Sequence, residues 1–146
     1  MISGGLRTEE KRPVKTSESR NTYVIVAYDG SEQSLKALRL AIKISPVLES
    51  KLIVLHACEE SKCNEDVLEE ARLILKSSSI NGEVRMLPYD SSLSSPASEI
   101  ISFARRISAS LIVIGATGSS CKEYCNLGST AASIAINSPI SVLIVR

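Results

Sequence analysis

From Thr22 onward the chain alternates between two kinds of hydrophobic pattern. Continuous apolar runs rich in β-branched residues are typical of strands buried on both faces. Between these runs, apolar residues recur every three or four positions, as on one face of a helix. The runs predict strands over residues 23–27, 51–57, 83–87, 111–115 and 139–146. The periodic stretches predict helices that begin near residues 32, 65, 96 and 129.

Polar residues mark where three of the helices begin. Ser31 and Asn64 precede the first two periodic stretches, and serine and asparagine are favoured N-caps. Ser95-Pro96 combines an N-cap with a proline at the first helical position, and Glu99 lies in the first turn, where its charge suits the helix dipole.

Strict alternation of strands and helices predicts an α/β fold, a parallel sheet with helices on both faces. In such sheets ligands bind beyond the carboxyl ends of the strands, where the winding direction reverses. Candidate functional residues are therefore those that directly follow the strands. They are Asp29-Gly30-Ser31, Cys58-Glu59-Glu60, Tyr89-Asp90 and the long loop from Gly115 to Thr130.

Composition narrows the function classes. The 146 residues suit one domain over 22–146, and residues 1–21, polar and rich in charge, read as a flexible arm. A net charge of +1, no tryptophan and one phenylalanine argue against a nucleic-acid partner or an anionic membrane surface. The apolar runs are shorter than a membrane span and the N-terminus lacks an apolar leader core, so we expect a cytoplasmic protein.

The loop "GATGSSCKEYCNLGST" concentrates three of the seven glycines. We expect Gly115 and Gly118 to adopt left-handed backbone and to admit a ligand close to the main chain. Gly128-Ser129-Thr130 then opens a helix, whose free amide groups and positive dipole end favour an anion. Lys122 could add positive charge. The chemistry alone fits either a phosphate site or a plain strand-to-helix connection with a serine cap.

No catalytic group is evident. Asp29 is either a turn aspartate or an acceptor for a ribose hydroxyl or a base amine. The single histidine, His56, lies inside an apolar strand and is interpreted as structural. No placed partner for a general base is found, and neither common phosphate-loop fingerprint occurs.

The spacing Gly115-x2-Gly118-x9-Gly128-Ser129 resembles the G-2x-G-9x-G-[ST] signature of ATP-binding universal stress proteins. The resemblance extends from Thr22 to Arg146. It includes the Asp-Gly-Ser after the first strand, "LIVLHA" as the second strand and "SPISVLIVR" as the last. The chain departs from the family at Ala27, where proline is common, and at Thr117, where a bulkier polar or basic residue is frequent.

The resemblance implies a Rossmann-like, adenine nucleotide hydrolase-like fold: an open five-stranded parallel sheet in the order 3-2-1-4-5. It implies ATP, with Mg²⁺, bound across the ends of strands one and four. From the residues themselves we expect no catalytic residue and no metal held by the protein. By position, the residues expected around the nucleotide are Ala27, Tyr28, Asp29, Ala57, Gly115, Thr117, Gly118, Gly128, Ser129 and Thr130. Tyr28, which directly precedes Asp29, could crowd the edge of the adenine ring.

Three functions remain open. The resemblance favours a stress-response regulator that binds ATP with little or no turnover. The alternatives are an enzyme of the related superfamily that hydrolyses ATP or transfers an adenylyl or phosphoryl group, and a partner-binding module without nucleotide. The last strand would be a sheet edge, which proteins cover, and family members pair that strand, so a homodimer through Ser141 to Val145 is implied.

Four cysteines complete the candidate chemistry: Cys58, Cys63, Cys121 and Cys125. Their placement on separate strand ends disfavours a shared zinc site. Free thiols are the leading interpretation, and a local Cys58–Cys63 or Cys121–Cys125 disulfide is the alternative.

Overall fold

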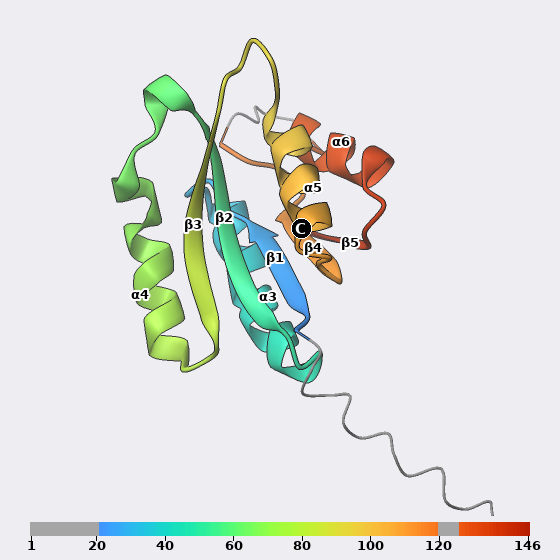
Figure 1. The fold of residues 1–146 in the computed structure, drawn as a ribbon. Helices are drawn as coiled ribbons and strands as arrows, with labels where there is room; N and C mark the ends of the chain where they lie inside the picture. Colours follow the sequence, from blue (N-terminus) through green and yellow to red (C-terminus); the bar gives the residue numbers. More distant parts are fainter. Residues whose placement is uncertain (1–20, 120–125) are drawn as a thin grey trace, which may run out of the picture.

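A computed structural model, which describes residues 21–119 and 126–146, shows one five-stranded sheet (Figure 1). All neighbouring strands are parallel, in the order β3-β2-β1-β4-β5. The predicted order is therefore confirmed. The strands are β1 (Tyr23–Ala27), β2 (Lys51–Glu59), β3 (Gly82–Tyr89), β4 (Leu111–Gly115) and β5 (Val142–Val145).

Helices cover both faces of this sheet. The α-helices are α3 (Glu32–Val47), α4 (Glu69–Ser78), α5 (Pro96–Arg106) and α6 (Ser129–Asn137). Helices α3 and α4 pack against one face and α5 and α6 against the other, as Figure 1 shows. Two short 3₁₀ turns, η3 (Glu60–Lys62) and η4 (Glu65–Leu68), connect β2 to α4.

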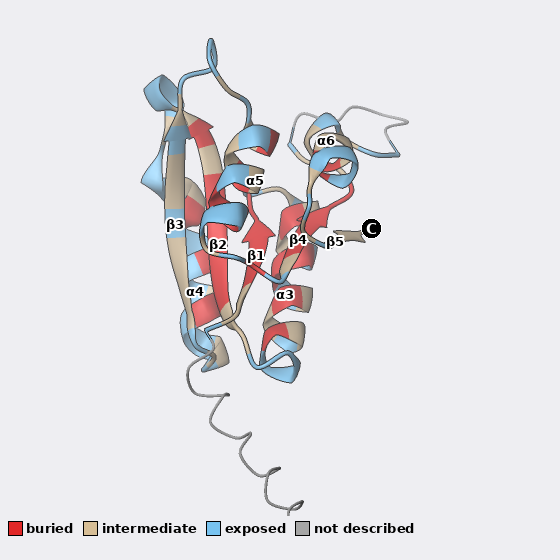
Figure 2. Cartoon of the chain, turned by 45° about the vertical axis from the view of Figure 1, so that its right-hand side comes forward, coloured by how far each residue is buried: buried red, intermediate tan, exposed pale blue. Residues whose placement is uncertain are grey.

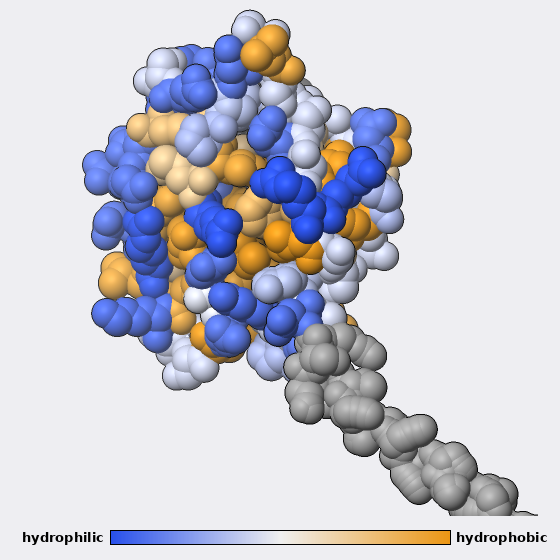
Figure 3. Space-filling view, in the orientation of Figure 1, coloured by the Kyte–Doolittle hydropathy of each residue, from blue (hydrophilic) through white to orange (hydrophobic). Residues whose placement is uncertain are grey.

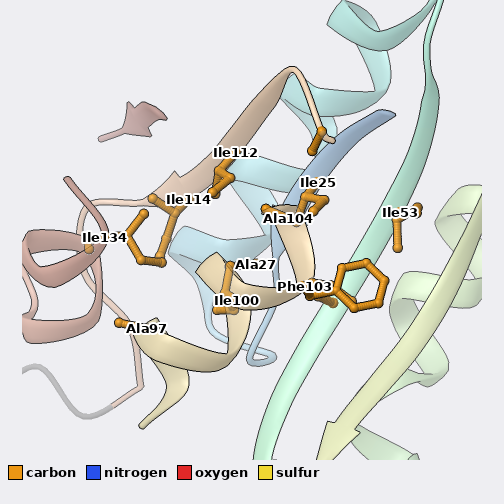
Figure 4. Close-up of a cluster of buried hydrophobic side chains, with 13 residues drawn as sticks. Ile25, Ala27, Ile53, Ala97, Ile100, Phe103, Ala104, Ile112, Ile114 and Ile134 are labelled. Carbon is orange, nitrogen blue, oxygen red and sulfur yellow. The ribbon is translucent and has the colours of Figure 1, made fainter. Parts of the chain in front are cut away.

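The central strands carry the core, because apolar side chains leave them towards both faces. Successive residues of β1 alternate between the two clusters: Val24 packs on the α3–α4 side and Ile25 on the α5–α6 side. Figure 2 shows the burial concentrated in the middle of the sheet. In Figure 4, Ala27, Ile100 and Ile114 lie in the α5–α6 cluster, towards the carboxyl ends of the strands.

The predicted caps are confirmed at two helices and shifted at a third. The Ser31 and Ser95 side chains accept hydrogen bonds from the amides of Ser34 and Ser98, both at 3.2 Å. Asn64 caps the 3₁₀ turn η4 through the Asp66 amide at 2.9 Å, so the expected α-helix begins later, at Glu69.

The bounds of β2, β3 and β5 differ from the expectation. Strand β3 spans Gly82–Tyr89 and extends beyond the expected 83–87 at both ends. Strand β2 continues two residues further, to Glu59, because it pairs with β3 along the whole of that strand. Strand β5 is confined to Val142–Val145. On α5 the buried side chains are Ala97, Ile100, Phe103 and Ala104, and Phe103 is 4% exposed.

Cys58 and Cys63 form a disulfide, with their Cα atoms 5.3 Å apart. For this pair the free-thiol interpretation is wrong. The 3₁₀ turn η3 explains the pairing, because it folds the chain back directly after β2 and brings Cys63 to the strand end. Cys121 and Cys125 lie outside the described residues.

The surface in Figure 3 mixes hydrophilic and hydrophobic residues. Hydrophilic residues gather at the left edge, where Figure 1 shows α4. In the described parts of the chain, no helix combines the length and the apolar character that crossing a bilayer requires.

Candidate functional site

A cavity of about 290 Å³ opens at the carboxyl edge of the sheet. It lies between the ends of β1, β2 and β4 and the first turns of α5 and α6, where the strand order reverses. All ten residues predicted around a nucleotide line it: Ala27, Tyr28, Asp29, Ala57, Gly115, Thr117, Gly118, Gly128, Ser129 and Thr130. The fold thus brings together three segments that are far apart in the sequence.

The cavity has an apolar and a polar side. Leu55 and Ala57 from β2 and Ile100 from α5 contribute apolar walls. The residues 117–119 and 128–130 contribute backbone amides and hydroxyl groups. Asp29 is the only charged side chain among the described lining residues at neutral pH. A ligand that joins a flat, weakly polar ring to a hydrogen-bonding group would suit a cavity with one apolar and one polar side.

Asp29 joins the end of β1 to the loop after β4. Its Oδ1 accepts a hydrogen bond from the Ser31 amide at 3.0 Å, and its Oδ2 accepts one from the Ser119 amide at 2.9 Å. Partial burial raises the pKa of the carboxyl, but the hydrogen bonds from Ser31, Ser119 and Ser34 outweigh burial and hold the pKa below its ordinary value. Asp29 is therefore ionised at neutral pH and already engaged by the protein.

His56 supports the same strand end from the neighbouring strand. Its Nδ1 lies 2.9 Å from the carbonyl oxygen of Tyr28, and a carbonyl can only accept, so Nδ1 carries the proton. The imidazole is 9% exposed. The structural interpretation of His56 therefore fits its contacts, because the ring ties β2 to the residue preceding Asp29.

Tyr28 is 3% exposed and packs within the α3–α4 cluster. Burial, together with Glu70 and Asp29, raises the pKa of its phenol, and Arg39 acts weakly in the opposite direction. The ring therefore belongs to the core on the α3–α4 side of the sheet, whereas the apolar wall of the cavity comes from the opposite cluster. Tyr28 is also among the residues that line the cavity.

Gly115 and Gly118 do not adopt the left-handed backbone that we expected of them, and Gly128 does not adopt it either. Gly30 is the only glycine with positive φ among the described residues. A Cβ on Gly115 would lie 3.0 Å from the Gln33 backbone, and a Cβ on Gly118 would lie 2.6 Å from Asp29 Oδ2. A Cβ on Gly128 would meet nothing closer than 3.5 Å. Close packing within the protein therefore requires glycine at two of the positions and not at the third.

The N-terminus of α6 faces the cavity. Gly128 is its N-cap, so no side chain caps the first amides of the helix. The Gly128 amide donates to the Ala116 carbonyl at 2.6 Å and fixes the start of the helix against the end of β4. Unpaired amides and the helix dipole make this end suitable for an anion.

Sequence reasoning missed several lining residues: Ser34, Leu55, His56, Pro96, Ile100, Ile114, Ala116, Ser119 and Ala131. The residues on α5 carried no recognisable signal, because Ile100 lies in an ordinary helical repeat and reaches the site only through packing. Ser119 offered one signal, since it directly follows a glycine that the pattern already placed in the loop.

No group of three or more possible metal-ligating side chains occurs within residues 21–119 and 126–146. Asp29 is the single carboxylate among the described lining residues, and each of its oxygens already accepts one amide hydrogen bond. Lys122, considered as a source of positive charge, lies outside the described residues.

Comparison with known proteins agrees with this geometry. A solved universal stress protein in complex with cAMP is 30% identical, with a TM-score of 0.70 over 86% of this chain and 97% of its own. The stress response protein NhaX of Bacillus subtilis is 28% identical and covers 84% of this chain and 96% of its own.

A universal stress protein from Archaeoglobus fulgidus, solved in complex with dAMP, shares the fold. Its TM-score is 0.64 at 19% identity, over 87% of this chain and 98% of its own. The sequence model of the universal stress protein family matches residues 21–146, and the chain therefore belongs to the universal stress protein family.

Proposed function

We propose that this chain binds an adenine nucleotide in the cavity at the carboxyl edge of the sheet. The base would lie against Leu55, Ala57 and Ile100, and the phosphate would lie against the amides that open α6. The observation that carries this proposal is the joining of an apolar wall and an uncapped helix N-terminus in one cavity of about 290 Å³. The related protein solved with cAMP supports it.

The proposal includes ATP as the physiological ligand, with Mg²⁺ entering on the nucleotide. Mg²⁺ binds phosphate oxygens and keeps several waters, so it does not need a protein cage. A single, partly engaged carboxylate in the described cavity fits a cation carried in by the phosphates.

We propose further that binding serves a regulatory role in stress physiology, with little or no turnover. His56 and Asp29, which are the imidazole and the carboxylate of the described lining, are each engaged in hydrogen bonds that hold the main chain. A general base needs a free lone pair within reach of the proton that it removes. It also needs a partner that orients it. His56 instead uses its Nδ1–H to hold the Tyr28 carbonyl, and Asp29 accepts hydrogen bonds from the Ser31 and Ser119 amides.

A nucleotide-release experiment tests whether the chain binds an adenine nucleotide and whether it turns ATP over. Freshly purified protein is denatured, and the supernatant is separated by ion-pair chromatography. Adenine nucleotide in near-stoichiometric amount is expected, and ATP added to the folded protein should stay intact over hours. Steady conversion of ATP to ADP or AMP would instead favour the enzyme, and the absence of any bound or binding nucleotide would favour a partner-binding module.

A further inference from the structure

Asp29 contacts the loop after β4 at two neighbouring residues, Gly118 and Ser119. The Ser119 amide donates to Asp29 Oδ2, and the Gly118 Cα lies so close that an added Cβ would approach the same oxygen to 2.6 Å. Such a separation is shorter than any ordinary contact. Gly118 and the Asp29 carboxylate therefore fit one another directly, before any ligand is considered.

Backbone conformation does not explain the glycine at 118. Gly30 alone has positive φ among the described glycines, so an alanine at 118 would meet no backbone strain of the left-handed kind. The space that the missing side chain leaves is taken by the carboxylate. Asp29 in turn is held by the Ser31 amide, which fixes its orientation from the β1 side.

We propose that Asp29 is a positioning residue, which holds residues 118–119 at the rim of the cavity through a charge-assisted hydrogen bond. In this role Gly118 is required by the carboxylate rather than by close approach of a phosphate. A hydrogen bond to an ionised acceptor is about twice as strong as a neutral one. The inference rests on the proposed function only where it concerns nucleotide affinity.

Asp90 provides a matched control within the same chain. It also follows a strand, β3, and its Oδ1 accepts hydrogen bonds from the Ser92 amide at 2.9 Å and from the Ser92 hydroxyl at 2.7 Å. It thus makes the same kind of local turn as Asp29 does with Ser31. It does not line the cavity, and its recorded hydrogen bonds stay within its own turn.

The first test is a double-mutant cycle in urea, with no ligand present. Gly118→Ala should raise the unfolding equilibrium constant by about tenfold in the wild-type background, an effect of ordinary size for a single substitution. In the Asp29→Ala background the same change should raise it by less than about threefold, because the carboxylate is gone. Equal effects in the two backgrounds would overturn the proposal.

The second test separates positioning from bulk stability. The amide proton of Ser119 should shift upfield in the NMR spectrum of Asp29→Ala and stay in place in Asp90→Ala. Affinity for AMP, measured by calorimetry, should fall by about tenfold in Asp29→Ala and remain unchanged in Asp90→Ala. An unmoved Ser119 resonance in Asp29→Ala would contradict the proposal.

The two proposals fail separately. If wild-type protein binds no adenine nucleotide, the proposed function is wrong, yet the urea cycle and the Ser119 resonance still decide the role of Asp29. If the nucleotide binds and the cycle is additive, the nucleotide site stands and Asp29 does not position the loop.

Discussion

At the residue scale, the loop glycines meet different demands. The spacing that the sequence displays is one pattern, but the structure packs Gly115 against the Gln33 backbone and Gly118 against a carboxylate, and leaves space beside Gly128. A regular spacing therefore gives no information on which glycine packs against protein and which faces open space. That difference makes the residues separable by experiment.

Gly128→Ala tests ligand approach directly. A Cβ at this position meets only ordinary contacts, so the free energy of unfolding should change by less than about 0.5 kcal/mol. If the phosphate lies against the start of α6, nucleotide affinity should still fall by about tenfold, or 1.4 kcal/mol. Calorimetry and urea unfolding of the same sample give both numbers.

Gly115→Ala is the matched comparison, because its Cβ would press on the Gln33 backbone. It should lower the unfolding midpoint in urea, where Gly128→Ala does not. A Gly128→Ala protein of normal stability that binds nucleotide as tightly as wild type would remove the phosphate from this end of α6.

The ionisation of Asp29 predicts a pH dependence of stability. Its pKa in the folded protein lies below the unfolded value of about 3.9, so its contribution is present above that value and disappears as pH falls through the folded pKa. The difference in unfolding free energy between wild type and Asp29→Asn should be constant above about pH 5 and shrink below about pH 4. Urea titrations from pH 7 to pH 3 measure it, and a difference that does not change with pH would contradict the assignment.

At the element scale, strands and helix starts followed from the sequence because their causes are local. Continuous apolar runs determined β1 and β4 to the residue, and the Ser31 and Ser95 caps depend on side chains within three positions. The 3₁₀ turns after β2 were missed because turns of three or four residues carry no apolar period of their own. Val67 of η4 lies near Gly30, a contact between distant parts of the chain that no periodicity describes.

The Cys58–Cys63 disulfide closes a short loop, with a sequence separation of 5. Chain-entropy arguments give such a loop about 2 kcal/mol of stabilisation. Adding a dithiol reductant should therefore lower the free energy of unfolding of wild type by about that amount. Cys63→Ala, measured with and without reductant, is the control, because any remaining reductant effect then belongs to other cysteines. An unchanged wild-type stability under verified reduction of this pair would contradict the estimate.

At the scale of the whole molecule, the sheet order places β5 at one edge beside β4. None of its four residues is fully buried, although all are apolar, and Ile136 on the adjacent α6 is 79% exposed. Exposed apolar edge strands invite pairing with another chain. We propose that a second copy covers this edge through Ser141 to Val145.

Sedimentation velocity tests the homodimer without assuming any function. A dimer is expected at tens of micromolar, with the monomer appearing on dilution. A single monomeric species over this range would contradict pairing through β5. The sample should be measured with and without nucleotide, since the cavity lies at the carboxyl edge of the same sheet.

The strand-end residues of the candidate site were predictable from the sequence, but the wall that α5 contributes was not. Asp29 and the loop after β4 were identified because parallel strands end at one edge of the sheet. Ala57 was expected from the family resemblance, and the strand-end candidates Cys58-Glu59-Glu60 and Tyr89-Asp90 do not line the cavity. Ile100 and Pro96 reach the cavity only because α5 crosses that edge, and the Asp29–Ser119 bond joins residues 90 positions apart. Such contacts depend on the packed fold, which the sequence pattern does not encode position by position.

Isothermal titration of nucleotide-free protein with adenine nucleotides shows whether the cavity at the carboxyl edge of the sheet holds a nucleotide. We predict saturable binding of ATP in the presence of Mg²⁺, one nucleotide per chain, with GTP binding at least about tenfold more weakly. Ala57→Leu, which adds side-chain volume to the apolar wall, should abolish binding while the protein stays folded. The protein must first be shown to be folded. If an adenine nucleotide at millimolar concentration then gives neither binding heat nor any competition, the proposed nucleotide binding is wrong.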